Sequence, residues 1–190
     1  MNILLIDNYD SYTYNIVHML HRHTSIRVHI YKNDQIPFAN LNQFQKIIIS
    51  PGPALPKDSG ELLRLIATTH KTHSMLGICL GHQAIAEVFG SQLFRLASPY
   101  HGFQTHIRST QSHSLFNNIA MPMQVGLYHS WAVEKESLTQ DLIATSFSDE
   151  GLLMSFKHQH LDIHGVQFHP ESYMTPQGHE LINQFLFPNN

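Results

Sequence analysis

The chain has 190 residues, a length that fits one α/β domain. Of these residues 42% are hydrophobic and 13% charged, a composition that excludes a disordered chain. The net charge of -3 comes without a basic run, so we expect no nucleic-acid partner. No stretch of about 18 apolar residues occurs and Met1 leads directly into an apolar segment, so we expect a cytoplasmic protein with no membrane partner. The single cysteine, Cys79, excludes an intrachain disulfide.

The first half of the chain alternates short apolar segments with amphipathic ones. Strands are predicted at residues 3–6, 26–31, 47–49 and 75–78, and helices over the segments around 14–20, 62–66 and 84–89. Asp10 or Ser11 is the predicted cap of the first helix. The segment 50–56 contains three prolines, so it is neither helix nor central strand. Repeated β-α units of this kind assemble into a parallel sheet.

The second half is built from short β-like pieces. They are predicted at residues 93–96, 124–127, 142–147, 152–156 and 163–168, and a last helix carries apolar residues between 181 and 186. No linker or repeat divides the chain. The sequence therefore predicts an α/β fold in a single domain, residues 1–190, with a central, mostly parallel mixed sheet flanked by helices.

Histidine is unusually frequent, with 16 residues. Seven of them lie at ligand-like spacings: His18, His21, His23, His70, His73, His158 and His160. A metal site needs three or four converging ligands, whereas the sequence shows mostly pairs. We therefore interpret these histidines as solvated surface residues and expect no metal site.

Cys79 lies in Gly77-Ile78-Cys79-Leu80-Gly81, directly after an apolar strand and before a helix. This small-x-nucleophile-x-small arrangement is typical of a nucleophile elbow, in which flanking glycines permit a sharp turn. A helix N-terminus behind the thiol lowers its pKa and offers N–H groups to an oxyanion. The alternative is a cysteine that serves only as a small buried apolar residue.

His169 and Glu171 follow the last predicted strand, in Gln167-Phe168-His169-Pro170-Glu171. The carboxyl ends of parallel strands share one sheet edge, so His169 can meet Cys79. The two-residue period places His169 and Glu171 on one side of an extended segment, where a carboxylate orients an imidazole. The alternative is a strand-end histidine beside a surface carboxylate. Together with the elbow, the pattern predicts Cys79 as nucleophile, His169 as base and Glu171 as orienting group.

Six motifs, in the same order along almost the whole chain, resemble the class I (triad-type) glutamine amidotransferases. Within that family the resemblance is to the small subunits of anthranilate synthase and aminodeoxychorismate synthase. The motifs are Asp7-Asn8-Tyr9-Asp10-Ser11-Tyr12-Thr13-Tyr14-Asn15, Ser50-Pro51-Gly52-Pro53, Gly77-Ile78-Cys79-Leu80-Gly81-His82-Gln83, His101-Gly102, Tyr128-His129-Ser130 and Gly165-Val166-Gln167-Phe168-His169-Pro170-Glu171-Ser172. The resemblance implies a flavodoxin-like sheet and the same catalytic roles for Cys79, His169 and Glu171.

The resemblance also implies residues that bind L-glutamine. The Pro-Gly-Pro loop would form one wall of the site, with the N–H groups of Gly52 and Leu80 as the oxyanion hole. The full implied set is Gly52, Pro53, Ala54, Leu80, Gln83, Ser130 and Trp131. The alternatives are that the loop is only a rigid turn and that the segment around Ser130 is only a strand end.

The implied function is hydrolysis of glutamine through a cysteine thioester, with ammonia supplied to a chorismate-utilising synthase subunit. No cofactor is implied in this chain, whereas the partner synthase is expected to use Mg²⁺. Two alternatives stay open: a stand-alone cysteine hydrolase on the same fold, and a non-catalytic partner-binding subunit.

Three positions depart from the family pattern. Ala54 stands where the family usually continues Pro-Gly-Pro with glycine, Phe103 where lysine follows His-Gly, and Leu127 where arginine precedes Tyr-His-Ser. Both lost cations lie outside the triad. We expect the absence of these two cations to affect docking to the synthase more than the chemistry.

Overall fold

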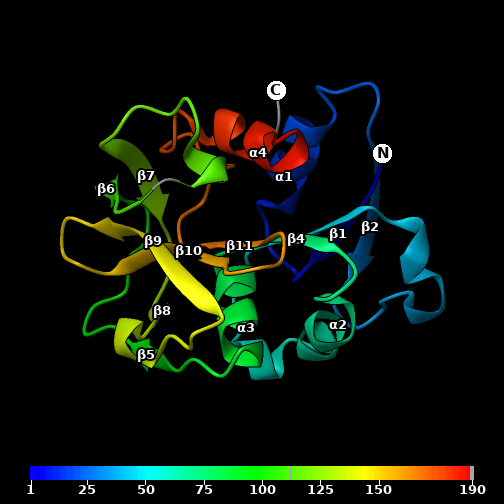
Figure 1. Cartoon of the computed structure of the whole chain (residues 1–190), viewed down its shortest axis with the longest axis horizontal. Coiled ribbons are helices and arrows are strands. Elements are labelled where there is room, and N and C mark those ends of the chain that lie inside the picture. Colours follow the sequence, from blue (N-terminus) through cyan, green and yellow to red (C-terminus); the bar gives the residue numbers. More distant parts are fainter. Residues whose placement is uncertain (112, 189–190) are drawn as a thin grey trace.

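The computed structural model describes residues 1–111 and 113–188, and within them nine strands form one sheet with helices on both faces (Figure 1). In spatial order the strands are β2 (Arg27–Lys32), β1 (Asn2–Asp7), β3 (Lys46–Ile49), β4 (Ser74–Ile78), β11 (Ile163–Val166), β10 (Leu153–His158), β9 (Leu142–Ser148), β6 (Phe103–Ser109) and β7 (Met123–Leu127). A separate pair consists of β5 (Leu93–Arg95) and β8 (Trp131–Val133). The helices are α1 (Thr13–Leu20), α2 (Leu62–Thr69), α3 (Leu80–Val88) and α4 (Gly178–Leu186), with 3-10 turns η1 (Phe38–Gln43), η2 (Pro56–Asp58), η3 (Ser114–Phe116) and η4 (Lys135–Ser137).

The sheet has a parallel half and an antiparallel half. The strands from β2 to β11 pair in parallel, and those from β11 to β7 pair antiparallel. The boundary falls at β11, which is parallel to β4 and antiparallel to β10. The predicted α/β fold with a mixed central sheet is confirmed.

The inner parallel strands β1, β3 and β4 are largely apolar because both faces of the sheet are covered there, whereas the edge strand β2 is only partly buried. On β1, Ile3 and Leu5 join the apolar core beneath α1 and α4, whereas Leu4 and Ile6 join the core against α2 and α3. Successive side chains of a strand point to opposite faces, so one short run of sequence supplies both cores. Figure 1 shows the two helix pairs on opposite sides of the sheet.

Two strands were not predicted, β6 and β8. In β6 only Thr105 and Ile107 are buried, so its apolar alternation is weak, and β8 has just three residues. The last predicted strand is shorter than expected because β11 ends at Val166 and the chain then enters turns. Strand pairing rather than local pattern defines these elements.

The predicted helix starts are also corrected. Neither Asp10 nor Ser11 caps α1; its N-cap is Tyr12, and the Asp10 carboxylate instead accepts a hydrogen bond from the Tyr12 N–H at 2.9 Å. Helix α3 begins at Leu80 rather than Ala84. The helix therefore starts immediately after Cys79, which places the thiol at its N-terminus.

The interpretation of the histidines as surface residues is wrong for several of them. Of the seven at ligand-like spacings, His158 is buried, where its Nδ1 accepts hydrogen bonds from two following N–H groups. His82, His113, His129, His164 and His169 are buried as well. Across residues 1–111 and 113–188, no cluster of three or more histidine, cysteine or acidic side chains is arranged to hold a metal ion. In the same residues, no helix is long and apolar enough to span a membrane.

Buried neutral histidines predict a loss of stability in acid. Burial lowers the pKa of His82 to about 3 and that of His113 to about 3, and the neighbouring His164 adds to the effect at His113. Between about pH 6.5 and 3 the unfolded chain therefore binds more protons than the folded one, so the free energy of unfolding falls as the pH falls. Each such group contributes a slope of up to about 1.4 kcal/mol per pH unit.

The measurement is urea unfolding at a series of pH values. We expect His82→Gln to flatten the pH slope between pH 6.5 and 4, whatever it does to stability at pH 7. His18→Gln is the control, because solvent reaches this exposed ring before and after unfolding. Equal slopes for His82→Gln and the unmodified chain would contradict the prediction.

Candidate active site

Four neighbouring parallel strands, β1, β3, β4 and β11, end at one edge of the sheet. The segments that follow these strands carry the motifs singled out in the sequence. Loops at the carboxyl ends of parallel strands converge, so these motifs lie close together. The Cys79 N–H donates a hydrogen bond to the Val166 carbonyl at 2.8 Å. This bond joins the end of β4 to the end of β11 and brings Cys79 near His169.

Cys79 occupies a strained backbone conformation. Its φ of 51° and ψ of −100° lie in a region that residues with a side chain rarely adopt, at a cost of order 1–3 kcal/mol. A Cβ on Gly77 would come within 2.4 Å of the Gly81 carbonyl, and one on Gly81 within 2.6 Å of the Ile49 carbonyl. Both glycines are therefore required sterically, as the elbow pattern implies.

His169 and Glu171 form a short buried hydrogen bond. Nδ1 of His169 donates to Oε1 of Glu171 at 2.6 Å, and both side chains are almost fully buried. The segment is a turn, in which the His169 carbonyl accepts the Ser172 N–H at 3.2 Å, and not the extended strand that the sequence predicted. The predicted contact between imidazole and carboxylate is nevertheless present.

The neighbours of His169 favour its protonated form. Burial lowers the pKa of His169, but the Glu171 carboxylate and the Cys79 sulfur outweigh burial and raise that pKa well above 6.5. Both interactions stabilise a positive ring, as in a thiolate–imidazolium pair. By contrast, burial lowers the pKa of nearby His129 to about 4, so that ring is neutral at pH 7.

A cavity of about 570 Å³ borders Cys79. Six of the seven residues predicted to bind glutamine line it together with the thiol: Gly52, Pro53, Ala54, Gln83, Ser130 and Trp131. Leu80 is not part of the lining. The cavity also contains Arg95, His101, Tyr128 and His129, which the sequence analysis did not assign to glutamine.

Leu80 instead packs beneath the Pro-Gly-Pro loop. A Cβ on Gly52 would lie 2.6 Å from Leu80 Cδ2 and 2.7 Å from Asn8 Cβ, so glycine is required here by packing inside the protein. As the first residue of α3, Leu80 has an N–H without an intrahelical partner. Its predicted contribution is thus restricted to the backbone.

Gln167 was quoted in a motif but given no role, and the structure places it at the centre of the site. Its Nε2 donates to Cys79 Sγ at 3.6 Å, and its Oε1 accepts from Gln83 Nε2 at 3.1 Å. Gln83 also donates to the Trp131 carbonyl at 2.8 Å. This chain of amides connects the thiol to the predicted substrate residues; its sequence signal was the position directly after a central strand.

A second cavity, of about 250 Å³, also borders Cys79. It is lined by Cys79, His169, Tyr128, the loop 51–53 and the β1–α1 segment 9–12. Burial raises the pKa of Asp10 in this lining. The two cavities share Gly52, Pro53, Cys79 and Tyr128, and their other lining residues differ.

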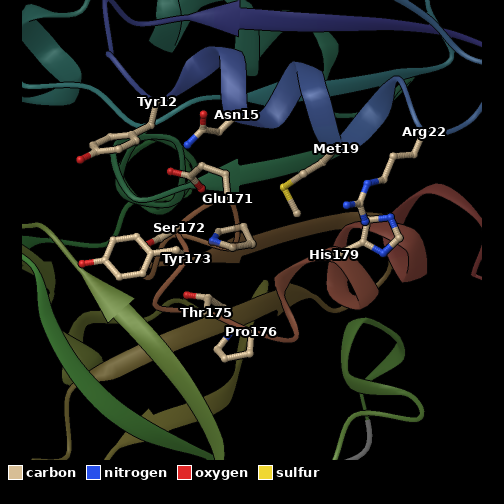
Figure 2. Close-up of a pocket in the computed structure, with 11 residues that line it drawn as sticks. Tyr12, Asn15, Met19, Arg22, Glu171, Ser172, Tyr173, Thr175, Pro176 and His179 are labelled. Atoms are coloured by element: carbon tan, nitrogen blue, oxygen red, sulfur yellow. The ribbon is translucent and has the colours of Figure 1, made fainter.

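A groove of about 400 Å³ lies beside the triad but contains neither Cys79 nor His169. Figure 2 shows Tyr12 and Asn15 near Glu171 at one end of it, and Arg22 and His179 at the other. It runs between α1 and the segment that leads into α4. Among the catalytic residues predicted from the sequence, only Glu171 borders this groove.

The two positions at which the family pattern has a cation are neighbours in the sheet. Phe103 on β6 is directly opposite Leu127 on β7. Leu127 is fully buried, whereas Phe103 is 44% exposed and stacks on Tyr100 with ring centroids 5.0 Å apart. An apolar cross-strand pair therefore occupies both positions, while Ala54 lies exposed on the wall of the larger cavity.

Comparisons with known proteins agree with this site. Residues 4–189 match the family Glutamine amidotransferase class-I. The chain is 39% identical to aminodeoxychorismate synthase component 2 of Escherichia coli K12, over 97% of this chain and 98% of that one. It is 37% identical to anthranilate synthase component 2 of Pseudomonas aeruginosa PAO1, over 97% and 94% respectively. A crystal structure from Thermoplasma acidophilum shares the fold, with a TM-score of 0.87 and 24% identity over 99% of this chain and 93% of that chain.

The chain belongs to the class-I glutamine amidotransferase family. Its full-length relatives include second components of both aminodeoxychorismate synthase and anthranilate synthase. The resemblance inferred from the six sequence motifs is confirmed.

The buried pair predicts separate effects of its two members. His169→Ala removes the predicted proton carrier and should lower glutamine hydrolysis by about 10³-fold or more, whereas Glu171→Gln leaves the ring and should cost less. Because Glu171 raises the pKa of His169, Glu171→Gln should also move the titration midpoint of that ring to lower pH.

Steady-state kinetics and NMR titration of the labelled imidazole measure the two effects. His18→Ala, on the exposed side of α1, is the control for loss of a histidine. An unchanged midpoint in Glu171→Gln would show that the carboxylate does not set the protonation of His169.

Proposed function

We propose that the chain is the glutaminase subunit of a chorismate-utilising synthase, hydrolysing L-glutamine and supplying the ammonia to its partner. The observation that carries this proposal is the position of Cys79, at a strained elbow beside the buried His169–Glu171 pair and between two cavities. The names of the relatives support the class of partner.

The chemistry begins with attack of the Cys79 thiolate on the side-chain amide carbon of glutamine. The protonated His169 ring then transfers its proton to the amide nitrogen, the C–N bond breaks and ammonia leaves. Water, deprotonated by His169, attacks the resulting γ-glutamyl thioester and releases glutamate and the thiol. These steps need only residues of this chain and water, and no cofactor. We expect Mg²⁺ only in the partner synthase.

The N–H groups of Gly52 and Leu80 are the proposed oxyanion donors. Within the described residues the Gly52 N–H donates no hydrogen bond, and the Leu80 N–H is unpaired at the helix start, so both are available. Each donor in such a hole contributes on the order of 10²-fold or more to the rate. A fixed position of the Gly52 loop is therefore essential to turnover.

The two cavities support separate paths for substrate and ammonia. The larger one is lined by most of the residues proposed to bind glutamine, and the smaller one is lined by Cys79 and His169 together with the exposed Tyr9 and Tyr12. Ammonia in water is protonated at neutral pH and loses its nucleophilicity. A synthase docked over the smaller cavity would receive it before it reaches solvent.

The test is a complex of this chain with the synthase that co-purifies with it. We expect Cys79→Ala to abolish glutamine-dependent synthesis and to leave ammonia-dependent synthesis intact, because the nucleophile acts only on glutamine. Identification of the product from chorismate, as anthranilate or aminodeoxychorismate, assigns the branch. Loss of both activities in Cys79→Ala would mean that the cysteine is structural.

Docking of the partner should also regulate glutaminase activity. The Asn8 N–H donates to Ser50 Oγ at 3.0 Å, and Asn8 Nδ2 donates to the Ser50 carbonyl at 2.8 Å. Asn8 also abuts Gly52, as the close approach at that glycine shows. The exposed β1–α1 segment is thus connected through one buried side chain to the proposed oxyanion loop.

We therefore expect the synthase and chorismate to raise glutaminase turnover about 10-fold or more, and Asn8→Ala to reduce that activation. Turnover is measured with and without the partner, and Asn40→Ala, at an exposed position, is the control. Alkylation of Cys79 by iodoacetamide reports whether the variant keeps an intact thiol. Equal activation of Asn8→Ala and the unmodified chain would eliminate this route of coupling.

A further inference from the structure

Arg95 lies in the larger cavity although it comes from outside the main sheet. It ends β5, where it pairs directly with Trp131 of β8, and the neighbouring Leu96 N–H donates to the Ser130 carbonyl at 2.9 Å. The two-stranded sheet therefore fixes Arg95 against the Ser130–Trp131 backbone. Both backbone residues line the cavity that contains Cys79.

Arg95 is an exposed residue at the wall of this cavity, and its charge has no acidic partner there. The described residues that line the cavity include no carboxylate. Arg95 is the one side chain among them that is charged at any physiological pH. No ion pair of Arg95 occurs within residues 1–111 and 113–188. A guanidinium presents a fork of donors that matches a carboxylate.

The cavity also offers an acceptor for a positive group. Gln83 uses its Nε2 to donate to the Trp131 carbonyl and to Gln167, which fixes the amide orientation. Its Oε1 accepts no hydrogen bond from the described residues and is therefore free to accept one from an ammonium group. A free amino acid carries one carboxylate and one ammonium on the same carbon, and the cavity provides a partner for each.

We propose that Arg95 binds the α-carboxylate of the substrate and makes the site selective for free glutamine over glutamine amidated or peptide-bound at that carboxyl group. The inference rests on the glutaminase function proposed above. In this arrangement the side-chain amide extends toward Cys79 and the head group stays at the cavity wall. Arg95 is thus a specificity residue that takes no part in bond breaking.

The experiment follows covalent labelling of Cys79 in the full chain, which needs no partner. The probe is 6-diazo-5-oxo-L-norleucine, a diazo ketone with the head group of glutamine; the thiol sulfur displaces N₂ and its proton ends on carbon, so a stable thioether forms. Mass spectrometry gives the labelling rate against probe concentration. The same probe with its carboxyl group converted to an amide reports the α-carboxylate contact, and iodoacetamide reports the intrinsic reactivity of the thiol.

For Arg95→Gln we expect labelling by the diazo ketone to require about 10- to 100-fold more probe, the contribution of a charge-assisted hydrogen bond. Discrimination between the acid and amide probes should disappear, and the iodoacetamide rate should stay unchanged. Arg95→Lys, which keeps the charge but loses the fork, should fall between. Arg108→Gln is the matched control, because Arg108 lies on β6 beside Asp149 and outside the cavity.

Equal labelling of Arg95→Gln and the unmodified chain by the acid probe would overturn the inference, as would equal discrimination against the amide. If Cys79 in the unmodified chain reacts with iodoacetamide but not with the diazo ketone, the glutaminase proposal itself fails. A weaker association with the synthase together with normal labelling would assign Arg95 to docking and also overturn the inference.

Discussion

The left-handed backbone at Cys79 is the constraint around which the site is organised. It requires a sharp turn between β4 and α3. The turn exists only because Gly77 lies close to the Gly81 backbone and Gly81 lies close to Ile49, where a Cβ would not fit. The hydrogen bond from the Cys79 N–H to Val166 ties this strained residue to the next strand of the sheet. A local cost of order 1–3 kcal/mol is thereby maintained by packing that the whole parallel sheet supplies.

The electrostatics of the site follow from burial combined with selective pairing. His169 and His129 are both buried, but only His169 has a carboxylate on its ring, so the same burial leaves one ring charged and the other neutral. A neutral His129 also avoids a second positive charge beside His169. The positive charge is therefore confined to the ring that interacts with the thiol.

The parallel half of the fold and the meeting of Cys79, His169 and Glu171 were predictable because both have local signatures. Apolar runs mark strands buried on two faces, and glycines at fixed spacing around Cys79 mark the elbow. The polar strand β6, the short β8 and the turn at His169–Ser172 were not predictable, since pairing partners distant in the chain define them. The place of Gln167 directly after β11 was its one sequence signal, whereas Arg95 has no distinctive spacing and only its tertiary position reveals it.

The order of strands explains why Cys79 and the Gly52 loop border both cavities. The chain leaves β3 through the Gly52 loop, between the segment after β1 and the start of α3, so this loop borders both cavities. Gly52 packs closely against both Asn8 and Leu80, so the Gly52 loop cannot shift toward them without displacing one of these side chains. Movements of the β1–α1 segment and of the proposed oxyanion loop are consequently coupled by contact. A single docked surface near Asn8 could therefore influence both the exit of ammonia and the geometry at the sulfur.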